Sequence, residues 1–275
     1  MLFLVATPLG NLGDITLRSL DVLKSVDAIV CEDTRRTLKL LSHYDIHRPL
    51  LSMPAFDEGR RVQSLVARLQ AGERLALVSD AGSVGISDPG ELLVAAAVAA
   101  GIKVEALPGP SAVITALQVS GLPTGRFTFV GFLPRKGEDR RQALVELAIL
   151  ASTLIVYESP RRLHETLLDL VAALGDRRAA IARELTKLHE EVARGTLSEL
   201  AAHFAGEVLG EVTLVIEGRG LSARTEPTES DIEAALERHA GENLGTRALA
   251  KAVAEELGLS SRDMYQRLLR KQPKD

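Results

Sequence analysis

Up to about residue 120, short runs of aliphatic and β-branched residues alternate with stretches whose apolar positions recur every three or four residues. The short runs are typical of buried strands, and the longer spacing is typical of helices with one apolar face. Buried strands separated by helices indicate an α/β fold with a mainly parallel sheet covered on both faces. The predicted strands are 2–6, 28–31, 49–53, 75–79 and 103–106, and the predicted helices are 17–25, 37–43, 62–70, 89–100 and 111–119.

A stretch rich in Gly and Pro at 120–125 predicts a domain boundary, and a second α/β unit follows it. The polar stretch 219–228 predicts a linker. We therefore expect three domains, at 1–120, 121–220 and 226–275. In the second domain the predicted strands are 127–132, 153–158, 179–183 and 212–217, and the predicted helices are 140–151, 160–174 and 197–204.

The last domain has a helical pattern only. Thr246 and Ser260 can each cap a helix, and Asp263 completes a capping box with Ser260. Gly258 suits the left-handed position that ends the first of these helices. Two helices joined by so short a turn predict a helix-turn-helix-like domain. The predicted buried residues are Leu249, Ala252, Val253, Leu257, Met264, Leu268 and Leu269.

Three glycine-rich turns, at 7–14, 79–90 and 107–112, follow the first, fourth and fifth predicted strands. Turns that follow parallel strands meet at one edge of the sheet, where α/β proteins bind ligands. None of the three matches the dinucleotide fingerprint or the phosphate-binding P-loop. The pattern predicts a ligand site at this edge, and the alternative is that all three are merely tight turns.

The turn at 79–90 carries two aspartates and no cation. Asp88 is placed to cap the next helix, with Pro89 at its first position and Glu91 completing a capping box, so we expect Asp88 to be structural. Asp80 has no such role in the pattern. Its carboxylate favours an uncharged or cationic ligand over a phosphate.

The composition limits the function classes. The 275 residues carry a net charge of −4, so any nucleic-acid contact must be a local basic patch. Cys31 is the only cysteine, which excludes an intrachain disulfide and fits a reducing cytoplasm. The six histidines show no zinc-ligand spacing, so no metal is expected. No signal peptide or membrane span is predicted.

Seven motifs between residues 5 and 191 occur in an order that resembles one protein family. The chain is similar to the ribosomal RNA small subunit methyltransferase I family, within the tetrapyrrole-methylase-like superfamily of S-adenosylmethionine-dependent methyltransferases. It departs from the usual motifs at Ser83 and Val84, where that family has Thr-Pro, and at Arg161, where His is common. The motifs are VATPLGNLGDITLR (5–18), EDTR (32–35), SDAGSVGISDPG (79–90), LPGPSA (107–112), GFLPRK (131–136), YESPRR (157–162) and ARELTKLHEE (182–191).

The resemblance implies two α/β domains of the tetrapyrrole-methylase type with the cofactor site between them, plus a helix-turn-helix-like C-terminal domain. It also implies a homodimer without a metal, and methylation of a cytidine ribose 2′-hydroxyl in the decoding region of small-subunit ribosomal RNA. The residues implied to contact S-adenosylmethionine are Leu9, Gly10, Asp80, Ser83, Val84, Gly85, Ile86, Ser111, Ala112, Tyr157 and Glu158.

A ribose hydroxyl is a weak acid, so its methylation benefits from a base or a nearby cation. Polar residues gather after the predicted strands 28–31 and 179–183. We expect Asp33 or Glu184 to act as base or orienting group. We expect Arg35 and Lys187 to hold a phosphate or to lower the pKa of the hydroxyl.

Basic residues recur in pairs, which suits phosphate contacts, although a solvated surface is the alternative. Two other functions stay open: a methyltransferase of tetrapyrrole precursors, and a non-catalytic RNA-binding factor of ribosome assembly. The pairs are Arg35-Arg36, Arg60-Arg61, Arg135-Lys136, Arg140-Arg141 and Arg161-Arg162, and the last helix and tail add Arg262, Arg267, Arg270, Lys271 and Lys274.

Overall fold

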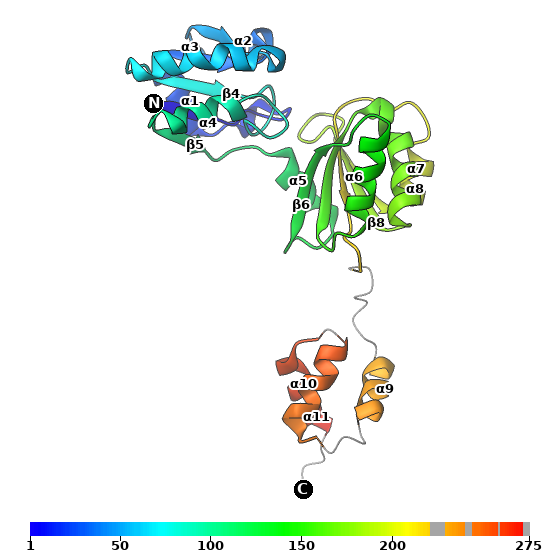
Figure 1. The fold of residues 1–275 in the computed structure, drawn as a ribbon. Helices are drawn as coiled ribbons and strands as arrows, with labels where there is room; N and C mark the ends of the chain where they lie inside the picture. Colours follow the sequence, from blue (N-terminus) through cyan, green and yellow to red (C-terminus); the bar gives the residue numbers. More distant parts are fainter. Residues whose placement is uncertain (221–228, 240–243, 258, 272–275) are drawn as a thin grey trace. The chain divides into compact units, whose positions relative to one another are not determined.

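The computed structural model describes residues 1–220, 229–239, 244–257 and 259–271. The chain forms two compact units, Met1–Arg219 and Gly220–Asp275, and each is described here by itself (Figure 1). Most of the predicted linker, Gly258 and Lys274 lie outside the described residues, as do the side chains of Arg270 and Lys271.

The first sheet is wholly parallel, with the strand order β3-β2-β4-β1-β5. Strand β1 lies between β4 and β5, and its last residue, Val5, is level with Val78 of β4 and Leu107 of β5. The segments that follow these three strands therefore start side by side. The strands are β1 (Leu2–Val5), β2 (Ala28–Cys31), β3 (Leu50–Ser52), β4 (Leu75–Val78) and β5 (Val104–Leu107).

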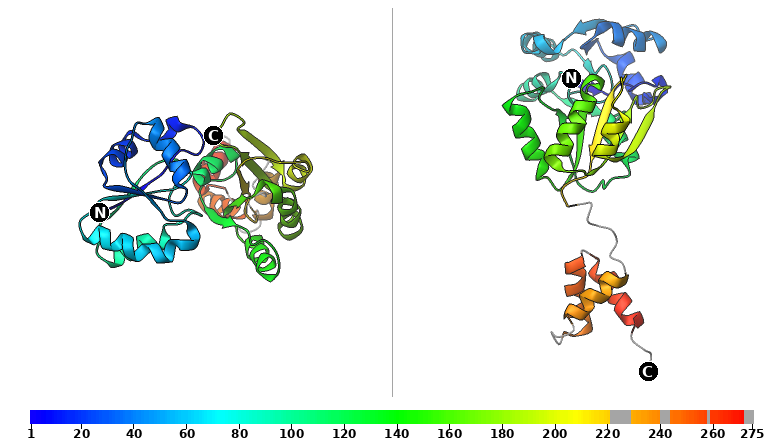
Figure 2. Two further views of the ribbon diagram at one scale, coloured as in Figure 1. Left: turned by 90° about the horizontal axis from the view of Figure 1, so that it is seen from above. Right: turned by 90° about the vertical axis from the view of Figure 1, so that its right-hand side faces the viewer.

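Helices cover both faces of this sheet, as the pattern of buried strands predicts (Figure 2, left). Alternate residues of each strand point to opposite faces, so one strand contributes side chains to the apolar clusters on both faces of the sheet. Phe3 and Val5 pack with the first pair of helices, and Leu2 packs with the second pair. The first pair is α1 (Leu17–Ser25) and α2 (Thr34–His43), and the second pair is α3 (Glu58–Gln70) and α4 (Glu91–Ala99).

The second sheet is mixed, with the order β6-β7-β10-β8-β9. Strand β6 runs parallel to β7, whereas β10 runs antiparallel to both of its neighbours, β7 and β8. The edge strand β9 was not predicted, because its sequence EVARGT carries charges and a glycine and is only partly buried. The strands are β6 (Phe127–Phe132), β7 (Thr153–Glu158), β8 (Arg178–Arg183), β9 (Glu191–Thr196) and β10 (Val212–Ile216).

The helices of the second sheet divide unequally between its faces. Helices α6 (Glu138–Ala148), α7 (Leu163–Leu174) and α8 (Leu197–His203) pack on one face. The other face is covered by α5 (Ala112–Ser120), which packs on β8 and β10 (Figure 1). The domain boundary near residue 120 stays a prediction, but this packing favours a boundary before α5.

In the described residues of the second unit, three helices pack around a small apolar core. Its helix α9 (Glu229–His239) contributes Ile232 and Ala235 to that core, next to the predicted pair α10 (Thr246–Leu257) and α11 (Ser261–Lys271). Ser260 accepts a hydrogen bond from the Asp263 N–H, as the predicted cap requires. Leu269 was expected to be buried, but it is 47% exposed.

The start of α4 differs from the prediction. Its cap position is Gly90, which makes no side-chain cap, and Asp88 lies outside the helix. The cap comes instead from Glu58 on α3, whose buried carboxylate accepts hydrogen bonds from the N–H groups of Gly90, Leu92 and Leu93. A glutamate 32 residues upstream of Gly90 leaves no local signal at this helix start.

Replacing Glu58 with Ala leaves those three N–H groups without their acceptor, so we expect a loss of about 1–3 kcal/mol in the free energy of unfolding. Glu58→Gln keeps an accepting oxygen and should lose less. Denaturant unfolding measures both variants, with Glu146→Ala on the exposed face of α6 as a control within about 0.5 kcal/mol of the parent. Equal stability of Glu58→Ala and Glu146→Ala would contradict this assignment.

Candidate functional site

The three glycine-rich loops of the first sheet are joined to one another by hydrogen bonds. Thr7 and Gly82 exchange backbone hydrogen bonds of 3.0 and 2.9 Å, and the Thr7 hydroxyl donates to the Ser79 carbonyl at 2.9 Å. The Ser83 hydroxyl donates to the Pro110 carbonyl at 3.1 Å. The loop at 79–90 is thereby fixed to both of its neighbours, so the three loops form one rigid edge.

These loops form one wall of a cleft with a volume of about 780 Å³, and the second sheet forms the other. This size is within the ~300–1,000 Å³ typical of small-molecule sites. Strand β10 contributes because it is antiparallel: its first residue, Val212, pairs with Glu158 at the end of β7. The segment Gly210–Thr213 therefore lies at the same edge as the end of β7 and lines the cleft.

The structure brings ten of the predicted site residues to this cleft and leaves five out of its lining. Val84 packs in the apolar cluster beneath α3 and α4, and Gly10 lies against the side chain of Lys187. The ten lining residues are Leu9, Asp33, Arg35, Asp80, Ser83, Ile86, Ser111, Ala112, Tyr157 and Glu158, and the five others are Gly10, Val84, Gly85, Glu184 and Lys187.

Asp33 is committed to a local ion pair. It is the N-cap of α2, and its carboxylate accepts hydrogen bonds from the Arg35 backbone N–H at 2.8 Å and from the Arg35 guanidinium at 2.9 and 3.1 Å. The Arg35 side chain is the main reason that the pKa of Asp33 falls to about 2. A carboxylate this stable in its ionised form is a weak base, so the predicted role of Asp33 as a base is not supported.

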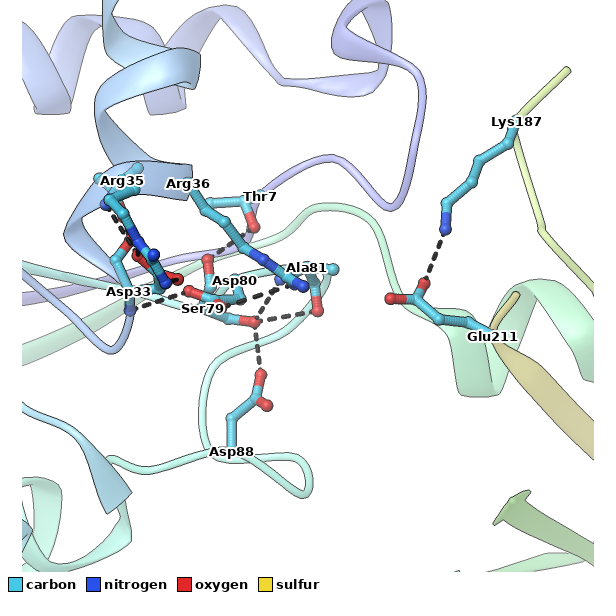
Figure 3. Close-up of polar contacts among 11 residues, drawn as sticks. Thr7, Asp33, Arg35, Arg36, Ser79, Asp80, Ala81, Asp88, Lys187 and Glu211 are labelled. Atoms are coloured by element: carbon cyan, nitrogen blue, oxygen red, sulfur yellow. Dashed lines mark hydrogen bonds and ion pairs between the residues drawn. The ribbon is translucent and has the colours of Figure 1, made fainter. Parts of the chain in front are cut away.

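Glu184 and Lys187 pair with each other. Lys187 Nζ lies 2.8 Å from Glu184 Oε1, and its hydrogen bond lowers the pKa of Glu184. Lys187 Nζ also lies 3.1 Å from Glu211 Oε2 (Figure 3). Only Glu211 of these three lines the cleft. These contacts do not support the predicted role of Glu184 as base, nor that of Lys187 in holding a phosphate or lowering the pKa of the hydroxyl.

Asp80 and Asp88 both face the cleft from the loop at 79–90 (Figure 3). Asp80 accepts a hydrogen bond from the Asp33 N–H at 3.2 Å and lies 3.6 Å from the Arg36 guanidinium. Asp88 accepts a hydrogen bond from the Ser79 hydroxyl. Burial raises the pKa of the Asp88 carboxyl.

On the opposite wall, Glu158 is fully buried and already partnered. It accepts hydrogen bonds of 2.7 Å from the Ser159 N–H and the Thr166 hydroxyl, and Arg162 lies 3.4 Å away. Its carboxylate is thus a structural anchor. The neighbouring Tyr157 is half-buried, and burial raises its pKa to about 12, so its hydroxyl stays neutral at physiological pH.

Several lining residues were not among the predicted site residues. Asp88 was assigned to a helix cap, and the residues of β10 were missed because a sequence does not tell an antiparallel strand from a parallel one. The motifs GFLPRK and YESPRR contain Phe132, Ser159 and Pro160, so these motifs could have been used to predict the three as site residues. The missed lining residues are Glu32, Thr34, Arg36, Ala81, Ser87, Asp88, Phe132, Ser159, Pro160, Gly210, Glu211, Val212 and Thr213.

The lining is strongly acidic. Six carboxylate residues line the cleft against two arginines, Arg35 and Arg36, both of which pair with aspartates of the same wall. This arrangement suits a ligand with positive charge. Among the described residues no group of His, Cys, Asp or Glu is arranged to hold a metal ion, and no helix is long and apolar enough to cross a membrane.

Comparisons with known proteins agree with this architecture. A model of the family described as tetrapyrrole (corrin/porphyrin) methylases matches residues 1–201. The protein from Halalkalibacterium halodurans called ribosomal RNA small subunit methyltransferase I is 46% identical, over 96% of this chain and 93% of its own length. The protein of the same name from Synechocystis sp. is also 46% identical, over 97% of this chain and 96% of its own length.

A solved structure shares the fold at low sequence identity. It is uroporphyrin-III C-methyltransferase from Thermus thermophilus, complexed with S-adenosylhomocysteine, with a TM-score of 0.57 and 19% identity. The match covers 80% of this chain and 98% of that chain. It supports the arrangement of two α/β sheets found here.

The Asp33–Arg35 pair makes a direct prediction about titration. Arg35→Ala removes the guanidinium donors, so the pKa of Asp33 should rise from about 2 toward 3.8. Because the pKa of Asp33 is lower in the folded state than in the unfolded state, the pair stabilises the fold at pH values above the unfolded-state pKa. This stabilisation is lost as the pH falls toward 2. Carbon-13 NMR of the Asp33 carboxyl measures the midpoint, with Arg61→Ala, the partner of Asp57, as control. A midpoint at 3.8 or above in the parent protein would contradict the pairing.

Proposed function

The chain belongs to the ribosomal RNA small subunit methyltransferase I family, and from this we propose that it methylates the ribose 2′-hydroxyl of a cytidine in the decoding region of small-subunit ribosomal RNA. S-adenosylmethionine is the methyl donor. Its sulfonium carries a methyl group activated for displacement, and the protein supplies alignment and handles the proton.

The extent of the similarity carries this proposal. The family model for tetrapyrrole methylases ends at residue 201, whereas the ribosomal RNA methyltransferases match 96–97% of the chain at 46% identity. Their similarity therefore reaches into the C-terminal helical unit. We favour an RNA substrate because the relatives named as ribosomal RNA methyltransferases are 46% identical to this chain, whereas the solved uroporphyrin-III C-methyltransferase is 19% identical.

The cleft fits the proposed cofactor in size and charge. The positively charged sulfonium and amino groups of S-adenosylmethionine are matched by the acidic lining, and the lining is continuous from the first sheet to the second. We propose that Leu9, Asp80, Ser111 and Ala112 hold the cofactor from the first sheet. Tyr157 would bound it from the second sheet with a neutral, half-buried ring.

Exposed cations near the cleft offer a path for the RNA phosphates. Arg135, Lys136 and Arg161 are exposed, and each follows a cleft-lining residue, Phe132 or Pro160, within a few positions. We propose that these three side chains contact phosphate groups.

Other predicted phosphate contacts are ruled out by their partners. Arg140 is buried, and its guanidinium donates hydrogen bonds to the Thr166 hydroxyl at 3.0 Å and to the Pro134 carbonyl at 2.9 Å. Arg162 donates to the same carbonyl at 3.2 Å. These two arginines therefore shape the turn that presents Arg135 and Lys136.

The helical unit is proposed to add RNA contacts through exposed basic residues such as Arg262 on α11. We further propose a homodimer. The edge strands β5 and β6 border an apolar hollow whose lining includes the partly exposed Ile86, Ile114 and Phe127, and a second copy would cover it. Because the proposed substrate is small-subunit ribosomal RNA, we also propose that the protein works in the cytoplasm.

The proposed reaction is tested by incubating the protein with radiolabelled S-adenosylmethionine and undermethylated small ribosomal subunits, followed by alkaline hydrolysis of the RNA. A methylated 2′-hydroxyl cannot attack the adjacent phosphate, so we expect label in alkali-resistant dinucleotides. Mapping that label identifies the nucleotide.

Label only in mononucleotides would mean base methylation and would overturn the proposed chemistry. Binding of RNA that does not depend on S-adenosylmethionine, with no label incorporated, would favour an assembly factor instead. A protein lacking residues 226–275 that stays fully active would argue against a role of the helical unit in RNA binding.

Ser83 provides a prediction about cofactor affinity. Ser83→Ala removes the hydrogen bond to Pro110 and loosens two of the loops proposed to hold the cofactor, so we expect the Kd for S-adenosylmethionine to rise about three- to tenfold, the equivalent of one ordinary hydrogen bond. Ser83→Thr keeps the hydroxyl and should stay within about twofold. Titration calorimetry measures both, and equal affinities of the Ala and Thr variants would contradict this role.

A further inference from the structure

The six carboxylates of the cleft differ in whether they already have a partner. Five are engaged: Asp33 with Arg35, Asp80 with Arg36 and a backbone N–H, Asp88 with Ser79, Glu158 with Thr166 and Arg162, and Glu211 with Lys187. Each such contact favours the ionised form or occupies a lone pair. Each of these five carboxylates is therefore committed to at least one contact within the protein.

Glu32 is the exception. It follows β2 directly, lines the cleft and is only partly exposed. Within the described part of the chain, no side-chain hydrogen bond or ion pair engages its carboxylate. The next residue, Asp33, caps the N-terminus of α2 and pairs with the Arg35 guanidinium, so these groups do not bind Glu32. The Glu32 carboxylate therefore lines the cleft without a protein partner among the described residues.

We propose that Glu32 is the general base that accepts the proton of the ribose 2′-hydroxyl. This inference rests on the proposed function and assigns the proton to a residue. In the step, the 2′-oxygen forms a bond to the methyl carbon while the O–H proton passes to Glu32. The carbon–sulfur bond breaks with its electron pair on sulfur, so the sulfonium becomes a neutral thioether, and Glu32 leaves the step as a neutral acid.

The surroundings of Glu32 suit this role. Burial and the negative charges of Asp80 and Asp88 raise its pKa, and Arg36 opposes them more weakly. Asp33 adds a further negative charge from the same segment, and Glu211 and Tyr157 line the cleft from the second sheet. A raised pKa makes the ionised carboxylate a stronger proton acceptor.

The test compares Glu32→Gln, Glu32→Asp and the control Glu146→Gln on the exposed face of α6. Single-turnover methylation should fall about 10²–10⁴-fold in Glu32→Gln, recover in part in Glu32→Asp and be unchanged in the control. Calorimetry should show that S-adenosylmethionine binds to Glu32→Gln within a few-fold of the parent. The acidic limb of the rate–pH profile should vanish in Glu32→Gln, which a purely structural role would not cause.

A Glu32→Gln rate within tenfold of the parent, with the acidic limb retained, would overturn the assignment. Absence of ribose methylation by the parent protein would instead contradict the proposed function, so the two failures are distinguishable. Carbon-13 NMR of the Glu32 carboxyl in the parent gives a readout that does not depend on a folded variant. A midpoint above 4.5 is expected, and one at or below 4.5 would count against this base.

Discussion

The parallel alignment of β1 between β4 and β5 is the constraint on which the rest of the site depends. Because Val5, Val78 and Leu107 are level, the chain leaves all three strands at one edge of the sheet. The loops that follow are then close enough for the Thr7–Gly82 and Ser83–Pro110 hydrogen bonds. A shift of one strand by a single residue would separate these partners and turn each side chain of that strand to the opposite face.

Local partners, more than residue type, decide what each carboxylate of the cleft can do. Asp33 and Glu32 are neighbours in the chain, yet the first has its pKa lowered by Arg35 and the second has its pKa raised by burial and by two aspartates. Similarly, Glu58 and not the predicted Asp88 caps the start of α4. Asp88 instead accepts a hydrogen bond from Ser79, and its negative charge raises the pKa of Glu32.

Strands β1, β2 and β4 followed from the sequence because their residues are apolar without interruption and almost all buried. The predicted strands at 127–132 and 153–158 match β6 and β7, which are rich in aromatic and β-branched residues. Strand β9 and the direction of β10 could not be predicted, since both depend on pairing with residues far along the chain. The prediction that Asp33 or Glu184 is the base stays a prediction, but the ion pairs of both carboxylates disfavour it, and these ion pairs are visible only in three dimensions.

The central claim is that the cleft between the two sheets, walled by the three joined loops and the start of β10, holds the cofactor. A crystal structure with S-adenosylhomocysteine tests it most directly. The account predicts that the molecule contacts Leu9, Asp80 and Ser111 on one side and the Gly210–Thr213 segment on the other. Density for the molecule in the apolar hollow beside β5 and β6, with this cleft empty, would contradict it.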